Sequence, residues 1–178
     1  MAADLTLPTD ATLQLLTAAV FAESSTRAFG GESHEEKEAI AWAILNMSHY
    51  ATVKPARARR GYNGNFGDGT VLGAIRAAID AYQGPRWRLI MNDLVLKPKA
   101  ELLRLQPGDL DHLRLVLVVT NAIGPAPMPP RALASLGNRE PVQFNQARDQ
   151  PPNPQRQEKI GRFARHTFYA FKSGREAE

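Results

Sequence analysis

The segment that decides the fold covers residues 9–50, TDATLQLLTAAVFAESSTRAFGGESHEEKEAIAWAILNMSHY. It holds two helical patterns separated by a short polar loop. Apolar side chains in the first pattern recur three and four positions apart, the spacing that gives a helix one apolar face. These positions are Leu13, Leu16 and Val20. Thr9 or Asp10 can cap the start of this helix with a side-chain oxygen, and the helix is predicted to end at Glu23.

The second helical pattern begins with SHEE at residues 33–36, a capping box in which Ser33 and Glu36 each satisfy a backbone N–H group. The apolar stripe that follows consists of Ala39, Ile40, Ala43, Ile44 and Met47. Because both helices carry an apolar face, we expect the rest of the chain to be organised around them.

Glu23 is the first charged residue after a dozen almost wholly apolar positions. A carboxyl group at an apolar helix end that faces a glycine-rich turn tends to have a raised pKa. Such a group can donate a proton near neutral pH. The alternative is that Glu23 only ends the helix and faces water, as charged side chains usually do.

Length and composition predict a single globular domain over residues 1–178, since the chain is 43% hydrophobic and large enough for a core. The net charge of +4 suits nucleic acid, an acidic membrane surface or an anionic cell wall, and does not choose among them. The chain has no cysteine, which excludes disulfides and cysteine metal sites. Its longest apolar run is far too short to span a bilayer.

The remaining chain is predicted to contain further helices and two irregular regions. The expected helices cover residues 71–83, 110–123 and 153–169, with a weaker helical segment at 101–105. Residues 54–69 are rich in glycine, asparagine and aromatic side chains, which favours a loop or a short hairpin. Residues 125–154 contain most of the prolines and form a long irregular region, often a functional edge of a domain.

Three stretches resemble, in the same order, the motifs of the SleB-like cell wall hydrolases, a family of the lysozyme-like superfamily. The first is residues 21–46, in which a glutamate closes the first helix and a Gly-Glu pair precedes an alanine-rich helix ending in Leu-Asn. The second is AYQGPRW at residues 81–87, and the third is IGRFARHTFY at residues 160–169. One departure is SST at residues 24–26, where the family often has glycine or alanine with arginine.

The resemblance implies a mainly α, lysozyme-like single domain with a short loop or hairpin beside the catalytic cleft. It also implies an enzyme that cleaves peptidoglycan between N-acetylmuramic acid and N-acetylglucosamine, as a muramidase or a lytic transglycosylase. Glu23 then acts as the general acid on the glycosidic oxygen. Glu32 of the Gly-Glu pair is the second catalytic residue, in a supporting role rather than as a nucleophile.

The resemblance also indicates residues that bind the sugar. In a lysozyme-like fold the segment after the catalytic glutamate lines the cleft, so Tyr62 and Phe66 can stack on sugar faces. The expected substrate-binding residues are Tyr62, Asn63, Asn65, Phe66, Asp68, Tyr82 and Phe144. An ordinary surface loop is the alternative interpretation of residues 61–69.

The second step of the reaction depends on which carboxylates lie near Glu23. With one carboxylate, Glu23 can act as a base on the muramyl 6-hydroxyl and give a 1,6-anhydro product. With Glu32 or Asp68 within about 5–10 Å, a water-mediated or covalent hydrolysis is also open. Neither route needs a cofactor or a metal ion.

Other classes of protein fit the sequence less well. HEEKE at residues 34–38 lacks the second histidine of the zincin motif. One alternative is a basic helical module without catalysis, either nucleic-acid-binding or regulatory. Such a module would place Arg57, Arg59 and Arg60 on phosphates. Those arginines lie in a loop beside glycines, and no expected helix has a basic face suited to base edges. An inactive peptidoglycan-binding relative is a third alternative.

No secretory signal is expected, because residues 1–12 contain two aspartates and no lysine or arginine. We therefore expect a protein made in the cytoplasm that acts in the periplasm or cell wall after delivery. A secretion-system carrier would deliver an antibacterial toxin, and a membrane pore would release a phage lysin. A toxin of this kind implies an immunity or inhibitor protein that plugs the cleft.

Overall fold

The computed structural model describes residues 8–28, 30–53, 107–124, 130–146 and 150–173. These parts of the chain form three α-helices, a short 3₁₀-helix and a three-stranded antiparallel sheet. The helices are α1 (Ala11–Glu23), α2 (His34–Val53), α6 (Pro107–Ile123) and η3 (Ala134–Leu136). The strands are β1 (Gln143–Gln146), β2 (Gln157–Phe163) and β3 (His166–Phe171).

Helix α1 confirms the first predicted helix, including its cap and its end. The Asp10 carboxylate accepts a hydrogen bond of 2.9 Å from the backbone N–H of Leu13. Ser24 ends the helix with an extended backbone. Every side chain from Leu15 to Phe21 is buried, so the helix is surrounded by protein on all sides. A helix that is apolar all round is expected in such a central position.

Helix α2 confirms the second predicted helix, but only half of the capping box forms. The Ser33 hydroxyl accepts a hydrogen bond of 3.1 Å from the backbone N–H of Glu36. The Glu36 carboxylate does not return to Ser33. It turns instead toward the loop between the helices, where Ser25 donates two hydrogen bonds to it.

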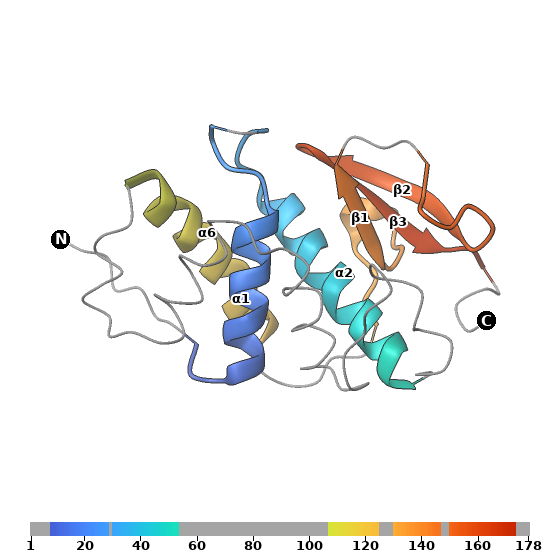
Figure 1. Ribbon diagram of the computed structural model, residues 1–178, viewed down its shortest axis with the longest axis horizontal. Helices are drawn as coiled ribbons and strands as arrows, with labels where there is room; N and C mark the ends of the chain where they lie inside the picture. Colours follow the sequence, from blue (N-terminus) through green and yellow to red (C-terminus); the bar gives the residue numbers. More distant parts are fainter. Residues whose placement is uncertain (1–7, 29, 54–106, 125–129, 147–149, 174–178) are drawn as a thin grey trace.

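Helix α6 begins three residues before the predicted position and ends where predicted, at Ile123. Its buried positions pack against both α1 and α2. A buried hydrogen bond of 2.9 Å joins the hydroxyl of Thr17 in α1 to that of Thr120 in α6. Helix α2 contacts α1 and α6, and it also contacts β1, so it lies between the other two helices and the sheet (Figure 1).

The sheet has the strand order β1-β3-β2, with both pairs antiparallel. Strand β3 is therefore central, and five of its six residues are buried. A bulge between Lys159 and Gly161 shifts the register of β2 against β3. The turn from β2 to β3 contains Ala164, whose φ of 46° lies in the left-handed region that a tight hairpin requires.

The expectation of a mainly α fold is wrong: the described chain combines three helices with a three-stranded sheet. Residues 153–169, predicted as the last helix, form most of the β2–β3 hairpin instead. A central strand buried on both faces shows no alternation of apolar and polar residues, so its pattern resembles that of a buried helix. The predicted hairpin or loop at 54–69 and the predicted helical segments at 71–83 and 101–105 lie outside the described residues.

Within the described residues, no helix is long and apolar enough to cross a lipid bilayer.

Candidate active site

Glu23 is the last residue of α1 and has the raised pKa that the sequence predicts. Burial, which removes water from the carboxylate, raises the pKa of Glu23 from 4.5 to about 7, against the positive charge of Arg165. A glutamic acid with this pKa is about half protonated at neutral pH and can donate a proton there.

Arg165 brings the β2–β3 turn to the end of α1. Its guanidinium donates a hydrogen bond of 3.0 Å to the backbone carbonyl of Glu23. Gly30 lies against the same side chain: an added Cβ would lie 3.3 Å from Cβ of Arg165 and 2.9 Å from Oγ of Ser25. Its φ of +85° also disfavours other residues. The glycine turn is thus packed closely against the hairpin.

Glu32 lies in a polar cluster with two buried basic side chains. Lys37 forms an ion pair with its carboxylate, and Nδ1 of His112 lies 3.0 Å from Oε1. Burial acts to raise the pKa of Glu32, but the hydrogen bond from Lys37 and the charges of His112 and Lys37 outweigh it, so the pKa falls below 4.5. Glu32 is therefore an ionised carboxylate held by two partners, unlike Glu23.

His112 is completely buried and uses both ring nitrogens. Its Nε2 lies 3.0 Å from the backbone carbonyl oxygen of Phe21, which can only accept a hydrogen bond. Its Nδ1 faces the ionised carboxylate of Glu32, which also only accepts. Hydrogen on Nδ1 and Nε2 would satisfy both acceptors, and the hydroxyl of Ser24, 3.4 Å from Nε2, is a third polar neighbour of this ring.

Glu36 forms a second buried cluster on the other side of the loop. Its carboxylate accepts hydrogen bonds from the backbone N–H of Ser25 at 2.7 Å, from the Ser25 hydroxyl at 2.6 Å and from Nδ1 of His166 at 2.7 Å. Burial acts to raise the pKa of Glu36, but these hydrogen bonds outweigh it and lower the pKa. Nε2 of His166 is buried and has no hydrogen-bond partner within the described part of the chain.

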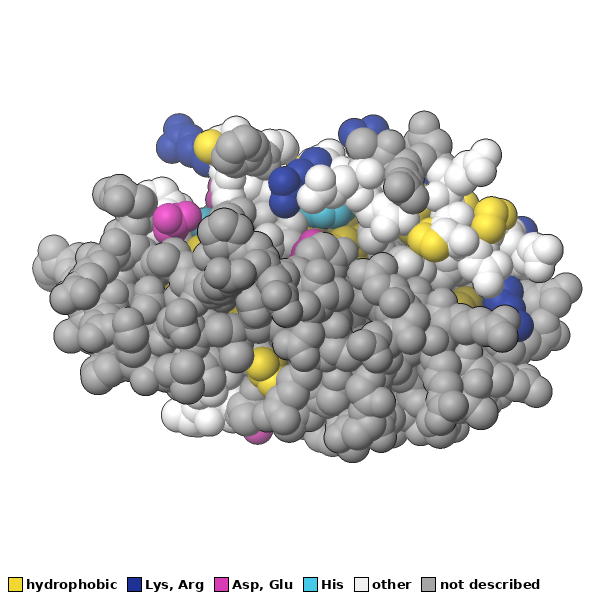
Figure 2. All heavy atoms as spheres, in the orientation of Figure 1, with side chains coloured by type: hydrophobic (Ala, Val, Ile, Leu, Met, Phe, Trp, Pro, Cys, Tyr) yellow, Lys and Arg dark blue, Asp and Glu magenta, His cyan; other side chains and the backbone are white. Residues whose placement is uncertain are grey.

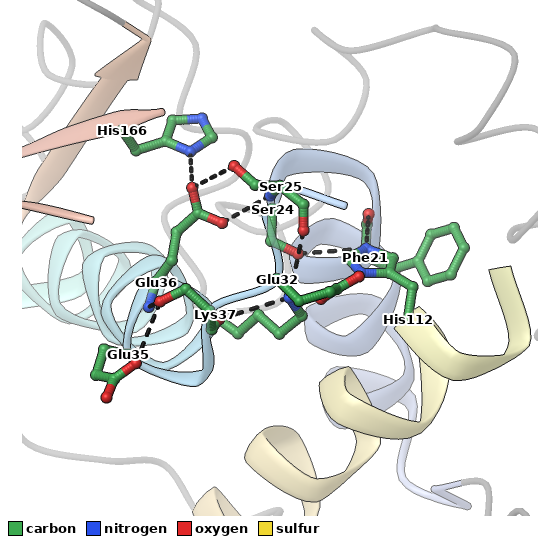
Figure 3. A network of polar contacts seen from close by, with 10 residues as sticks. Phe21, Ser24, Ser25, Glu32, Glu35, Glu36, Lys37, His112 and His166 are labelled. Atoms are coloured by element: carbon green, nitrogen blue, oxygen red, sulfur yellow. Dashed lines mark hydrogen bonds and ion pairs between the residues drawn. The ribbon is translucent and has the colours of Figure 1, made fainter. Parts of the chain in front are cut away.

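The two clusters flank the segment that joins α1 to α2 (Figure 3). His166 and Ser25 converge on Glu36 from one side, while Lys37 and His112 converge on Glu32 from the other. On the face shown in Figure 2, lysine and arginine side chains gather along the upper edge, where Figure 1 places this loop and one end of the sheet. The positive charge that acts on Glu23 itself is that of Arg165.

The other predicted site residues have different positions. Phe144 in β1 is only 6% exposed and packs in the core against the rings of His166 and Phe168, so it offers no open ring face to a sugar. The predicted residues outside the described chain are Tyr62, Asn63, Asn65, Phe66, Asp68 and Tyr82.

Four titratable residues of the two clusters were not predicted as part of the site: Glu36, Lys37, His112 and His166. A signal was present for two of them. Glu36 stands four positions before Ile40 on the buried face of α2, and His112 stands four before Val116 on the buried face of α6. A charged or titratable side chain on an apolar helix face must find a buried partner, which marks it as part of a polar cluster.

Among the described residues, no group of three or more histidine, aspartate or glutamate side chains could hold a metal ion. Comparisons with protein-family models, curated proteins and solved structures gave no match. The resemblance to the SleB-like hydrolases thus rests on the motifs quoted above.

Proposed function

We propose that this protein is a relative of the SleB-like hydrolases that cleaves the glycan strand of peptidoglycan between N-acetylmuramic acid and N-acetylglucosamine. The observation that carries the proposal is the position of Glu23 at a helix end beside a glycine turn, where burial raises the pKa of its carboxyl group to about 7. Glycosidic cleavage needs a carboxylic acid that is still protonated near neutral pH and is positioned to protonate the leaving oxygen.

In the proposed first step Glu23 gives its proton to the glycosidic oxygen while positive charge develops on the sugar ring. Glu23 becomes a carboxylate in this step. The nearby positive charge of Arg165 stabilises that carboxylate, because it favours the ionised form of Glu23. Arg165 thereby assists proton donation without contacting the sugar.

The second step in our proposal uses the same glutamate. The carboxylate of Glu23 accepts the proton of the muramyl 6-hydroxyl, whose oxygen attacks the anomeric carbon and gives a 1,6-anhydro product. Glu32 is a poor nucleophile for the covalent route, because Lys37 and His112 already bind its carboxylate. We assign Glu32 the supporting role of holding those two cations.

Mass analysis of soluble products from purified peptidoglycan tests this proposal. We expect muropeptides with 1,6-anhydro ends from the wild-type protein and none from Glu23→Gln. Products with reducing ends would show that the second step is hydrolysis and not the attack of the muramyl 6-hydroxyl. Absence of cleavage, together with tight and steeply salt-dependent binding to DNA or RNA, would overturn the proposal in favour of a nucleic-acid-binding module.

A further inference from the structure

Basic side chains from three elements contact alternate backbone carbonyls around Glu23. Nε2 of His112 in α6 lies 3.0 Å from the carbonyl oxygen of Phe21. The Arg165 guanidinium in the β2–β3 turn donates to the carbonyl of Glu23 at 3.0 Å. Lys37 in α2 donates to the carbonyl of Ser25 at 3.3 Å.

These contacts satisfy groups that a helix end leaves without partners. The last carbonyls of an α-helix have no intrahelical N–H, and they form the negative end of the helix dipole. Of the carbonyls at the end of α1, that of Val20 accepts from the backbone N–H of Ser24, while those of Phe21 and Glu23 accept from side chains. Positive charge is favourable at this end of a helix.

Two carboxylates in turn hold the cations and the loop in place. Glu32 binds both His112 and Lys37, so it joins α6 to the start of α2. Glu36 binds the backbone N–H and the hydroxyl of Ser25, the second residue after Glu23. All three partners of Glu36 are buried, which strengthens these bonds and makes their loss costly.

We propose that Glu36 and His112 are positioning residues that fix the chain on either side of Glu23, and with it the carboxyl group that donates the proton. This inference rests on the proposed function. Glu36 holds the residues after Glu23, and His112 holds the residues before it. Neither side chain needs to touch the substrate to act in this way.

The effect on rate follows from geometry. A general acid must lie within hydrogen-bonding distance of the atom that it protonates, and a misplacement of about 1 Å costs up to about 10²-fold in rate. Loss of either positioning residue frees one side of the segment and lets water approach the carboxyl group of Glu23.

The kinetic test compares Glu36→Gln and His112→Gln with the wild-type protein on purified peptidoglycan. We expect kcat to fall about 10–10²-fold with KM nearly unchanged, because the acid is displaced while the sugar contacts remain. Ser25→Ala removes only one hydroxyl donor to Glu36, so it is expected to fold and to show a smaller fall in kcat. Glu35→Gln is the matched control, because this exposed glutamate is on the same helical turn and its carboxylate accepts from Ser33.

A second measurement needs no substrate. In protein carrying ¹³C-labelled glutamate, the side-chain carboxyl signal of Glu23, assigned by its loss in Glu23→Gln, is followed against pH. We expect the wild-type signal to titrate near 7 and the signals of Glu36→Gln and His112→Gln to titrate closer to 4.5, since water then reaches the carboxylate. Glu35→Gln should leave the titration unchanged.

The two measurements separate the inference from the proposed function. If the wild-type protein cleaves no peptidoglycan, the proposed function fails, and the titration alone decides whether Glu36 and His112 position Glu23. If both variants keep the wild-type kcat within about twofold, or leave the titration of Glu23 unchanged, neither is a positioning residue.

Discussion

The three glutamates around the α1–α2 loop show how partners decide the chemistry of one residue type. Burial disfavours the charge on all three. At Glu32 and Glu36, hydrogen bonds and nearby positive charges more than offset burial, so both carboxylates stay ionised. At Glu23 only the charge of Arg165 opposes burial, and burial dominates. Of the three, Glu23 alone is therefore suited to donate a proton at neutral pH.

Substitution of Glu23 by glutamine tests this assignment directly. Glutamine keeps the size of the side chain but cannot donate the proton, so we expect the rate of wall cleavage to fall by at least about 10²–10⁴-fold. The helical circular dichroism should stay at the wild-type level. Lysis of purified walls by Glu23→Gln at the wild-type rate would remove Glu23 from the mechanism.

The pH dependence of cleavage gives a second prediction. Glu23 must be protonated to act as an acid, and its pKa is about 7. We expect kcat/KM to fall about tenfold for each pH unit above 7 as the free enzyme loses this proton. Turbidity loss of wall suspensions, measured at several pH values on both sides of 7, provides the profile. A rate that stays constant from neutral to alkaline pH would mean that another group donates the proton.

At the residue scale, the sequence identified Glu23 but not its surroundings. Glu23 stands out because it interrupts an apolar helix, which is a local feature. The capping box gives the Glu36 carboxylate a local partner, and the place of Glu36 on the apolar face of α2 indicates a buried partner without identifying it. Its actual partners, Ser25 and His166, come from a loop and from a distant strand.

At the scale of elements, the helices with regularly spaced apolar residues were predicted correctly, and the strand without such a spacing was not. Helices α1, α2 and α6 were predicted from apolar residues three and four apart and from their capping residues. Strand β3 was predicted as a helix because the run HTFYAF is almost wholly buried and does not alternate. The aromatic and β-branched residues of this run favour a strand, and Gly161 weakens a helix there.

Gly161 gives a prediction for the sheet and its packing. A Cβ at this position would lie 2.5 Å from Cδ2 of Leu136, which is itself buried. We expect Gly161→Ala to lower the free energy of unfolding by about 1–3 kcal/mol, as overpacking does. Urea denaturation measures this change.

Two further variants make the interpretation specific. In Gly161→Ala/Leu136→Ala the clash is absent, so the double variant should lose less stability than the sum of the two single variants. Gly108→Ala is the matched control, because a Cβ there meets no atom within 4 Å. It lies in α6, where alanine is favoured over glycine by up to about 1 kcal/mol. If the stability losses of Gly161→Ala and Leu136→Ala simply add up in the double variant, the close packing of these two residues is contradicted.

At the scale of the whole molecule, the site exists only because the chain returns to α1 from distant positions. Residues 21–37 provide the loop, His112 comes from α6, and Arg165 and His166 come from the end of the β2–β3 hairpin. No local pattern relates these segments. The sequence motifs at residues 21–46 and 160–169 were recognised separately, and only the fold places them side by side.

Two carboxyl groups of the site make the stability of the folded protein depend on pH in opposite directions. Glu23 has a raised pKa in the folded state, so its contribution to stability is fully present below 4.5 and is lost as pH rises to about 7. That loss amounts to at most about 3 kcal/mol, and solvent around a partly exposed carboxyl group reduces it. Glu36 has a lowered pKa, so its contribution is present above 4.5 and is lost as the pH falls.

Two variants separate these contributions when their free energies of unfolding are measured by urea denaturation at acidic, neutral and alkaline pH. Glu23→Gln should match the wild-type protein below pH 4.5 and become more stable than it as the pH rises to about 7, because glutamine carries no buried charge. Glu36→Gln should be less stable than the wild-type protein at neutral pH, with a difference that narrows in acid. The free energies of unfolding of Glu23→Gln and the wild-type protein could instead differ by the same amount from pH 4.5 to 7. In that case the carboxyl group of Glu23 is not shielded from water, and its pKa is too low for it to act as the acid.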